Sequence, residues 1–208
     1  MNANLRSTSA VLGFPRIGPQ REVKKALEAY WGDKISAEEL LKVAKEQRLN
    51  TYATIKEQGV DFVPTGTFSL YDHVLDMSNT LGIIPEAYAT SGLSQLDTYF
   101  AMARGHQKGG VDLPATEMKK WFDSNYHYLV PEFSEKSEFK LNDNKPVDDF
   151  IEAKEAGYNA RPVILGPLTL LWLGKTSKDA QDPNFNRYSL LPKLAQTSVS
   201  YTHLRAHE

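Results

Sequence analysis

Apolar residues recur at helical spacing near the start of the chain. Five of them follow the i, i+3, i+4, i+7, i+8 pattern: Val23, Ala26, Leu27, Tyr30 and Trp31. Gly32 follows the last of these, so the pattern predicts a helix over residues 20–31 with one apolar face. The segment before it, which begins "LGFPRIG" at Leu12, is interpreted as an apolar strand and the loop that follows it.

Capping signals place the next two elements. Ser36 and Glu39 have the spacing of a capping box, and Gly59 stands where the residue after a helix is expected. The sequence therefore predicts a second helix between these signals. The segment "VDFVPTG" at residues 60–66 then predicts a short strand that ends in a Pro-Gly loop.

Two further helices are expected over residues 70–82 and 94–105, the second opened by Ser94 and Asp97. The segment over residues 117–133 is rich in aromatic and polar side chains but has no clean period. It is therefore interpreted as a loop or short strand that lines something, rather than as a plain helix.

The last part of the chain adds a surface segment that enters a helix near Pro146, followed by "RPVILGP" at residues 161–167. This continuous apolar run predicts a strand buried on both faces of a parallel sheet, with a turn after it. Strands, loops and helices thus alternate, which predicts an α/β fold with parallel strands. Ligands gather at the carboxyl ends of such strands, so three loop segments are expected on one face: "FPRIG", "PTGTFSLYDH" and "GPLTLLW".

Composition narrows the class of partner. The 208 residues carry a net charge of -2, which gives no overall electrostatic footprint for nucleic acid or for an acidic membrane surface. The longest apolar stretch, over residues 162–174, is too short to span a bilayer, and the N-terminus lacks the apolar core of a secretory signal. A small-molecule partner and a cytoplasmic location are therefore expected. No cysteine is present, so the chain offers no disulfide, no thiolate nucleophile and no cysteine-based metal site.

Three cations stand in the opening turns of the first helix, where the helix dipole is already positive: Arg21, Lys24 and Lys25. One interpretation is a site for an anion, because the helix N-terminus also offers backbone N–H groups. The other is a solvated face on which Lys24 pairs with Glu28, and the residues alone favour this second interpretation.

Four segments, in this order, resemble the amino-terminal domain of the cobalamin-independent methionine synthases: "LGFPRIGPQREVKKALEAYW", "EMKKWFDSNYHYLVPEF", "RPVILGPLTLLWLGK" and "SLLPKL". These enzymes are methyltetrahydropteroyltriglutamate–homocysteine methyltransferases. The resemblance runs from about Val11 to Leu194, and several separated motifs in family order make it specific.

The resemblance implies a TIM-type (βα)8 barrel, here truncated, over residues 11–194, after a flexible N-terminus at residues 1–10. Residues 195–208 are unlike the family and resemble translated adapter sequence, so we expect the natural sequence to end near Leu194. A broken barrel would expose the apolar strand at residues 162–166 and an unpaired sheet edge.

The reaction that the resemblance implies moves a methyl group from 5-methyltetrahydropteroyltri-L-glutamate to L-homocysteine, giving methionine. In the family, zinc activates the homocysteine thiol without cobalamin, and its His, Cys, Glu and Cys ligands lie in a carboxy-terminal barrel. This chain is therefore expected to bind the folate polyglutamate as a monomer, to leave zinc and homocysteine to that other barrel, and to be inactive in isolation.

The resemblance also carries substrate contacts onto six residues of this chain: Arg21, Glu22, Val23, Lys24, Lys120 and, as in some members only, Asn125. With the resemblance, the anion-site interpretation of the first helix is preferred. A lysine at residue 120 could hold a carboxylate, and Asn125 could fix an amide. The neighbouring rings of Trp121 and Phe122 could cover apolar ligand surface, although packing is the favoured interpretation for most aromatics in this segment.

Neither a catalytic residue nor a metal ligand is assigned within this chain. Adjacent residues rarely face each other on a helix, so Asp72 and His73 are not interpreted as an acid-oriented imidazole. Three functions stay open: part of a methyltransferase, a module that binds folate polyglutamate without transfer, and a truncated fragment with no function. The lack of cysteine separates the first from the others, because the zinc chemistry needs ligands that this chain lacks.

Overall fold

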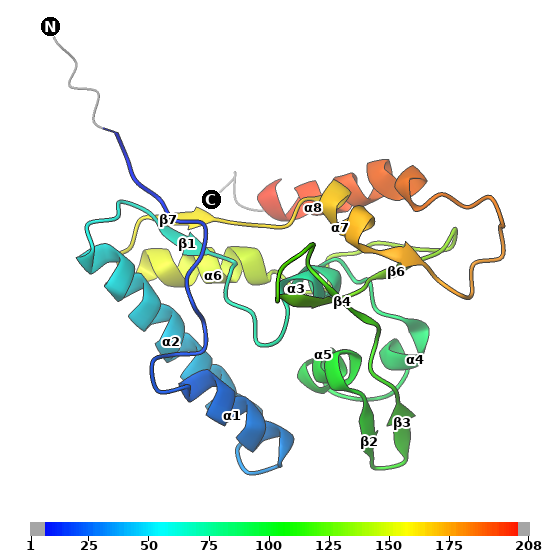
Figure 1. The fold of residues 1–208 in the computed structure, drawn as a ribbon, viewed down its shortest axis with the longest axis horizontal. Helices are drawn as coiled ribbons and strands as arrows, with labels where there is room; N and C mark the ends of the chain where they lie inside the picture. Colours follow the sequence, from blue (N-terminus) through cyan, green and yellow to red (C-terminus); the bar gives the residue numbers. More distant parts are fainter. Residues whose placement is uncertain (1–6, 204–208) are drawn as a thin grey trace, which may run out of the picture. The chain divides into compact units, whose positions relative to one another are not determined.

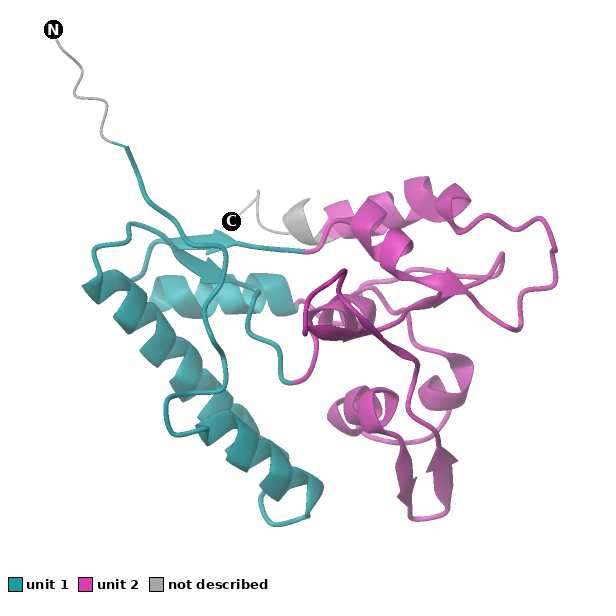
Figure 2. Cartoon of the chain, viewed as in Figure 1, with its two compact units in different colours: residues 1–70, 145–164 teal, residues 71–144, 165–208 magenta. Residues whose placement is uncertain are grey.

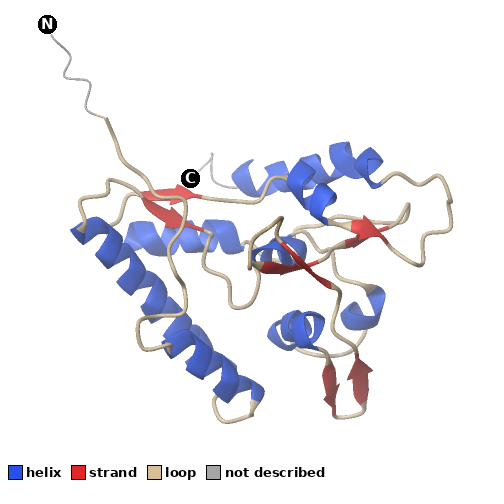
Figure 3. Ribbon diagram, in the orientation of Figure 1, coloured by secondary structure: helices blue, strands red, loops and turns tan. Residues whose placement is uncertain are grey.

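The protein folds as a mixture of helices and short strands (Figures 1 and 3), so the predicted α/β class is confirmed. The structure is a computed structural model that describes residues 7–203, with side chains for residues 7–200. It divides into two compact units: unit 1 comprises residues 1–70 and 145–164, and unit 2 comprises residues 71–144 and 165–208 (Figure 2). Within the described part, no helix is both long and apolar enough to cross a membrane.

Unit 1 places helices against a small parallel sheet. Its elements are α1 (Glu22–Trp31), α2 (Ala37–Glu57), β1 (Val63–Thr65), α6 (Lys145–Glu155) and β7 (Ala160–Pro162). Strand β1 pairs in parallel with β7, with Val63 opposite Ala160 and Thr65 opposite Pro162. The predicted parallel pairing is therefore present, between strands that are far apart in the sequence.

The core of unit 1 forms where α2 and α6 cover β1. Tyr52 and Ile55 of α2 pack with Val63 and with Ala153 of α6, all at most 3% exposed. The predicted capping box of α2 is confirmed, because the Ser36 hydroxyl accepts from the Glu39 N–H and the Glu39 carboxylate accepts from the Ser36 N–H.

An ion pair also joins these two helices. The Arg48 guanidinium donates to both carboxylate oxygens of Glu152, over 2.7 and 2.9 Å. A bidentate pair of this kind fixes orientation as well as charge, so it sets how α2 and α6 face each other.

Two predicted strands differ in the structure. The first strand, expected near Leu12, is reduced to a single parallel bridge between Ala10 and Phe62, and Leu12 itself is 73% exposed. The strand expected over residues 161–167 is also wrong as a doubly buried strand, because β7 ends at Pro162 and has only β1 as a partner.

The apolar residues that follow this run form a helix, α7 (Pro167–Leu173), where the sequence predicted a turn. Proline at the first helical position is compatible with a helix start, and Leu170, Leu171 and Leu173 are buried on one side. Ile164, between the two elements, is 36% exposed, as expected for an incompletely covered strand, whereas Leu165 is buried.

Unit 2 combines helices with three two-stranded sheets. Its helices are α3 (His73–Thr80), α4 (Glu86–Ala89), α5 (Gln95–Arg104), α7, the 3-10 helix η1 (Arg187–Leu190) and α8 (Leu191–His203). Its strands are β2 (His106–Lys108), β3 (Val111–Leu113), β4 (Met118–Lys120), β5 (His127–Leu129), β6 (Glu132–Phe133) and β8 (Lys175–Thr176). The pairs β2–β3 and β4–β5 are antiparallel, and β6 pairs in parallel with β8.

The segment over residues 117–133 therefore consists of short strands, as one of its two predicted forms. The described residues form no closed barrel, because each strand has a single partner and barrel closure needs two neighbours for every strand. Of the N-terminal segment 1–10 that was predicted to be flexible, residues 1–6 lie outside the described part. Within the rest, the Ser9 N–H donates to the Asp61 carboxylate over 2.8 Å.

A buried carboxylate organises the centre of unit 2. Asp72 is 1% exposed, and its side chain caps α3 by accepting from the Leu75 N–H over 2.9 Å. The same carboxylate accepts from the Leu129 N–H over 3.0 Å and from the Tyr126 hydroxyl over 2.7 Å. One side chain thus joins the start of α3 to strand β5 and to the residues that lead into it.

Removal of this carboxylate is expected to destabilise unit 2. Asp72→Ala leaves buried donors without an acceptor, so the free energy of unfolding should fall by about 2–4 kcal/mol. Ser94→Ala is the matched control, because Ser94 caps α5 at an exposed position and its loss should cost only about 1 kcal/mol. Urea denaturation followed by circular dichroism measures both values. An Asp72→Ala cost no larger than that of Ser94→Ala would contradict this role.

Candidate functional site

The first group of predicted site residues lies at the start of α1. The helix begins at Glu22, two residues later than predicted, because Arg21 adopts left-handed backbone angles with φ 61°. The Arg21 N–H donates to the Gly18 carbonyl over 3.0 Å, and the Val23 N–H donates to the Ile17 carbonyl over 3.1 Å. The loop therefore folds back onto the helix start and presents the Arg21 side chain to solvent.

The four residues of this group have different surroundings. Val23 is fully buried, so a ligand could reach only its backbone. The Glu22 carboxylate accepts from the Gln20 N–H over 3.0 Å and so holds the loop. Arg21 and Lys24 are the members that can present positive charge to an anion. All four assignments stay predictions.

Lys24 does form the ion pair that the alternative interpretation expected. Its ammonium lies 3.5 Å from the Glu28 carboxylate, and both side chains are about half exposed, at 45% and 58%. Exposed pairs of this kind contribute at most about 1 kcal/mol, so a ligand carboxylate can replace Glu28 at small cost. Arg21 makes no ion pair with any residue in the described part.

The second group lies on the β4–β5 hairpin of unit 2. Lys120 is the last residue of β4 and stands opposite His127. Asn125 lies in the connecting turn, where its carbonyl oxygen is 2.9 Å from the His127 Nδ1 atom, and its side chain is exposed. The structure thus brings Lys120 and Asn125 onto one hairpin. The hairpin belongs to unit 2 and the start of α1 belongs to unit 1, so each group of residues is described separately.

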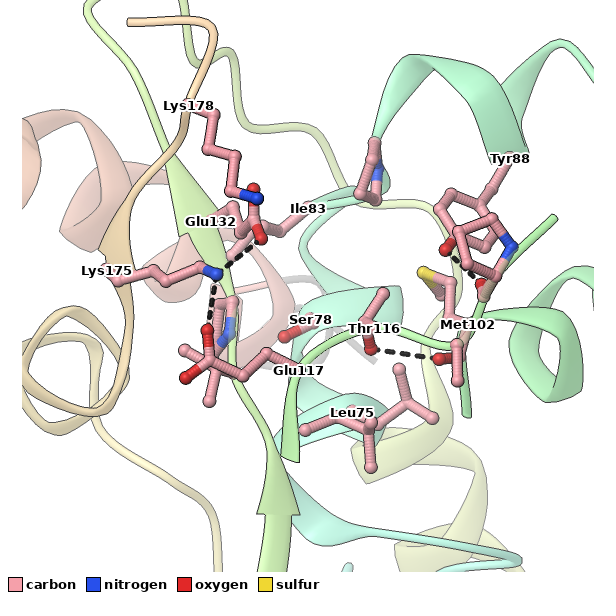
Figure 4. A pocket seen from close by; sticks show the side chains of 16 residues that line it. Leu75, Ser78, Ile83, Tyr88, Met102, Thr116, Glu117, Glu132, Lys175 and Lys178 are labelled. Atoms are coloured by element: carbon pink, nitrogen blue, oxygen red, sulfur yellow. Dashed lines mark hydrogen bonds and ion pairs between the residues drawn. The ribbon is translucent and has the colours of Figure 1, made fainter. Parts of the chain in front are cut away.

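A pocket of about 500 Å³ lies within unit 2 (Figure 4). Its walls come from α3, α4 and α5 and from residues 114–117 and 129–132, with Lys175 and Lys178 at one side. Most of this lining is apolar. Both ends of the segment 117–133 line this pocket, through Glu117 and residues 129–132, whereas none of its aromatic residues do.

The charged side of the pocket is a small ion network. The Lys175 ammonium lies 2.5 Å from a Glu117 carboxylate oxygen and 3.0 Å from a Glu132 carboxylate oxygen. Dashed lines mark both ion pairs in Figure 4. Lys119 lies 3.2 Å from the other oxygen of Glu117. The hydrogen bonds from Lys175 and Lys119 lower the pKa of Glu117, and those to Glu117 and Glu132 raise the pKa of Lys175.

The ammonium of Lys175 and the carboxylates of Glu117 and Glu132 place both signs of charge at one side of the pocket, so this side is suited to position charged or polar groups. The sequence interpretation missed Glu117, Glu132 and Lys175, although all three stand inside the quoted segments. The sequence marks these three residues only as charged side chains within otherwise apolar or aromatic runs.

Neither unit offers a zinc site in its described residues. No group of three or more His, Asp or Glu side chains there could hold a metal ion, and the chain contains no cysteine. These residues therefore do not supply a Cys-containing zinc site of the kind that the resemblance implied for the carboxy-terminal barrel.

The pKa of Glu117 provides a test of its pairing with Lys175. In the wild-type chain Glu117 should titrate below its ordinary value of 4.5, and Lys175→Met should raise that pKa. A lowered carboxyl pKa contributes stability above pH 4.5 that is lost as pH falls through the folded value, so the variant should be less stable at neutral pH and equally stable in acid.

Carboxyl-detected NMR measures this pKa residue by residue. Lys178→Met is the control, since Lys178 lines the same pocket without an ion pair to a described residue, and it should leave the pKa of Glu117 unchanged. An equal effect from both substitutions would show that the pairing with Lys175 is not the cause.

Comparison with known proteins places the chain in a family. Residues 8–204 match the family described as "Cobalamin-independent synthase, N-terminal domain". This match and helix α8 both extend past Leu194, and the domain boundary drawn there from the sequence stays a prediction.

Individual relatives agree with the family match. A protein of Schizosaccharomyces pombe named "Probable 5-methyltetrahydropteroyltriglutamate--homocysteine methyltransferase" is 55% identical over 197 residues, which are 92% of this chain and 25% of the relative. Proteins named as the same methyltransferase are 54% identical in Saccharomyces cerevisiae, over 89% of this chain and 25% of the relative, and 49% identical in Caulobacter vibrioides, over 91% and 26%. This chain spans about a quarter of the length of these relatives. The chain belongs to the family of cobalamin-independent synthase N-terminal domains.

Proposed function

We propose that this chain forms the folate-binding part of a methyltransferase that transfers a methyl group from 5-methyltetrahydropteroyltri-L-glutamate to L-homocysteine, giving methionine. The observation that carries the proposal is the family match over most of the chain, with relatives whose names state this donor and acceptor. These relatives are about four times as long as the aligned segment, so the complete reaction is proposed for the longer protein.

The part of the work proposed for this chain is to hold the polyglutamate tail. A triglutamate offers several carboxylates on a flexible chain. Arg21 and Lys24 lie three positions apart at the N-terminal end of α1, where the helix dipole also favours negative charge. An Arg or Lys bonded to a carboxylate forms a charge-assisted hydrogen bond, which is about twice as strong as a neutral one.

Lys120 and Asn125 would contribute from the β4–β5 hairpin, one through an ammonium and the other through an amide. Both are exposed, and Lys120 makes no ion pair with a described residue. In this proposal Glu22 does not contact the tail, because its negative charge would repel the carboxylates of the tail. Its carboxylate instead holds the loop before α1 by accepting a hydrogen bond from the Gln20 N–H. Val23 would take part only through its backbone.

For the isolated 208-residue chain we propose binding without transfer. In the family that the chain resembles, zinc carries the homocysteine thiol on ligands that include cysteine, and this chain contains none. Zinc and homocysteine would be held by the other part of the longer enzyme. No cobalamin is needed in this proposal, in keeping with the family's description.

We further propose that the parallel pairs β1–β7 and β6–β8 become part of a (βα)8 barrel in the longer protein. Parallel pairs connected through helices are the units from which such a barrel is built. A monomeric, cytoplasmic protein is proposed as well, on the basis of the chain's ordinary soluble composition.

The length of the glutamate tail provides the test. The wild-type chain should bind pteroyltriglutamate about 10- to 100-fold more tightly than pteroylmonoglutamate, because the longer tail adds charge-assisted hydrogen bonds worth about 1.5–3 kcal/mol in total. Lys24→Ala and Lys120→Ala should each reduce this difference, and the triple variant that also carries Arg21→Ala should remove it. Isothermal titration calorimetry measures each affinity.

Lys42→Ala is the control, because Lys42 is an exposed lysine of α2 away from the predicted contacts. It should leave the dependence on tail length unchanged, and added salt should weaken the dependence in the wild type. Equal affinity of the wild-type chain for the two folates would rule out the proposed tail site.

A further inference from the structure

The pocket of unit 2 combines an apolar wall with a charged side, and the proposed function uses neither (Figure 4). The wall includes Leu75, Met102 and Leu129, whose side chains are at most 3% exposed. The volume of about 500 Å³ lies within the range of small-molecule sites, which is roughly 300–1,000 Å³. A ligand that complements this pocket therefore needs an apolar part for the wall and a polar part for the charged side.

The charges at that side balance one another. Two carboxylates and two ammoniums line it: Glu117, Glu132, Lys175 and Lys178. A ligand with a net charge would leave one sign in excess, and charges in a protein pocket are screened less than charges in water. A zwitterion carries one charge of each sign and keeps the balance.

Two of these four side chains can each bond a ligand as well. Lys175 lies 3.0 Å from one oxygen of Glu132, so the other oxygen of that carboxylate can accept from a ligand ammonium. Lys178 forms no ion pair with a described residue, and its ammonium can donate to a ligand carboxylate. Figure 4 shows the side chains of Glu132 and Lys178 at the same side of the pocket.

The hydroxyl groups of the lining act as acceptors toward a ligand. The Ser78 hydroxyl donates to the Val74 carbonyl over 2.9 Å, and the Thr116 hydroxyl donates to the Met102 carbonyl over 2.9 Å. Tyr88 also donates its hydroxyl to a backbone carbonyl, over 2.6 Å. Because their hydrogens are already bonded, these groups offer only lone pairs. This favours a ligand that brings N–H donors over a plain carboxylic acid.

We propose that this pocket binds a free α-amino acid with a large apolar side chain. The ammonium of the ligand pairs with Glu132, its carboxylate pairs with Lys178, and its side chain lies against the apolar wall. Both charges of an α-amino acid are attached to the same carbon atom, so both reach one side of the pocket while the side chain extends away from it. The flexible thioether of Met102 lets the wall adapt to side chains of different shape.

No bond of the ligand changes at this site, so it is a binding site and not a second catalytic centre. The inference does not rest on the proposed function, because it uses neither the folate nor the names of the relatives. The acceptor amino acid of the proposed reaction stays with the other part of the longer enzyme.

Four small probes test the parts of the ligand separately. L-Leucine is the complete probe, L-alanine shortens the side chain, leucinol lacks the carboxylate and 4-methylpentanoate lacks the ammonium. Each is titrated into the full 208-residue chain by calorimetry. L-Leucine should bind about 10- to 100-fold more tightly than each of the others, because each lacks either about three buried carbon groups or one charge-assisted hydrogen bond.

Two variants connect the probes to the residues. Glu132→Gln should remove most of the preference for L-leucine over 4-methylpentanoate, and Lys178→Met should remove most of the preference over leucinol. Each variant should keep the other preference, which a general loss of folding would not allow. Glu138→Gln and Lys193→Met are the matched controls, because these residues pair with each other in unit 2 and do not line the pocket. They should change neither preference.

Three results would overturn the proposal. If L-leucine shows no saturable binding, or binds no more tightly than L-alanine, the wall does not take an apolar side chain. If 4-methylpentanoate binds as tightly as L-leucine, the pocket selects an anion and not an amino acid. If L-leucine binds but leaves the backbone amide signals of Ile83, Thr116 and Lys178 unshifted in NMR, the site lies elsewhere. Binding of pteroyltriglutamate is measured separately, so none of these results decides the proposed function.

Discussion

Unit 2 depends on one buried carboxylate. Asp72 takes hydrogen bonds from the Leu75 and Leu129 backbone N–H groups and from the Tyr126 hydroxyl, so the start of α3 and the β4–β5 hairpin share one acceptor. Buried donors need partners, and a two-stranded hairpin is only marginally stable in water. The buried Asp72 side chain therefore anchors the hairpin that presents Lys120 and Asn125.

Local signals in the sequence predicted much of what the structure contains. The capping box of Ser36 and Glu39 and the cap at Ser94 act within one helical turn, so they could be identified without tertiary information. The run at residues 161–167 could not, because a continuous apolar segment fits a buried strand or a helix equally well. Its outcome was set by tertiary context: β7 found one partner strand, and the residues after Gly166 packed as α7.

The site residues, too, could be predicted only where the signal is local in the sequence. Arg21 and Lys24 drew attention because charge at a helix start is a local anomaly, and the structure places them at that start with Arg21 exposed. Lys175 meets Glu117 across 58 positions of the sequence, so no spacing rule could connect them. The resemblance pointed to Lys120, whereas the neighbouring Lys119 pairs with Glu117 of the ion network. The two lysines therefore have different neighbours although they are adjacent in the chain.

The central claim is the proposal that this chain binds a folate polyglutamate, with candidate contacts at the start of α1 in unit 1 and on the β4–β5 hairpin in unit 2. The most direct measurement is an NMR titration of the isotope-labelled chain with pteroyltriglutamate, followed at every assigned backbone amide. We expect saturable shifts in two segments, residues 18–25 and residues 119–126. Shifts confined to the pocket around Ile83, Tyr88 and Thr116, or no saturable shift at all, would contradict it.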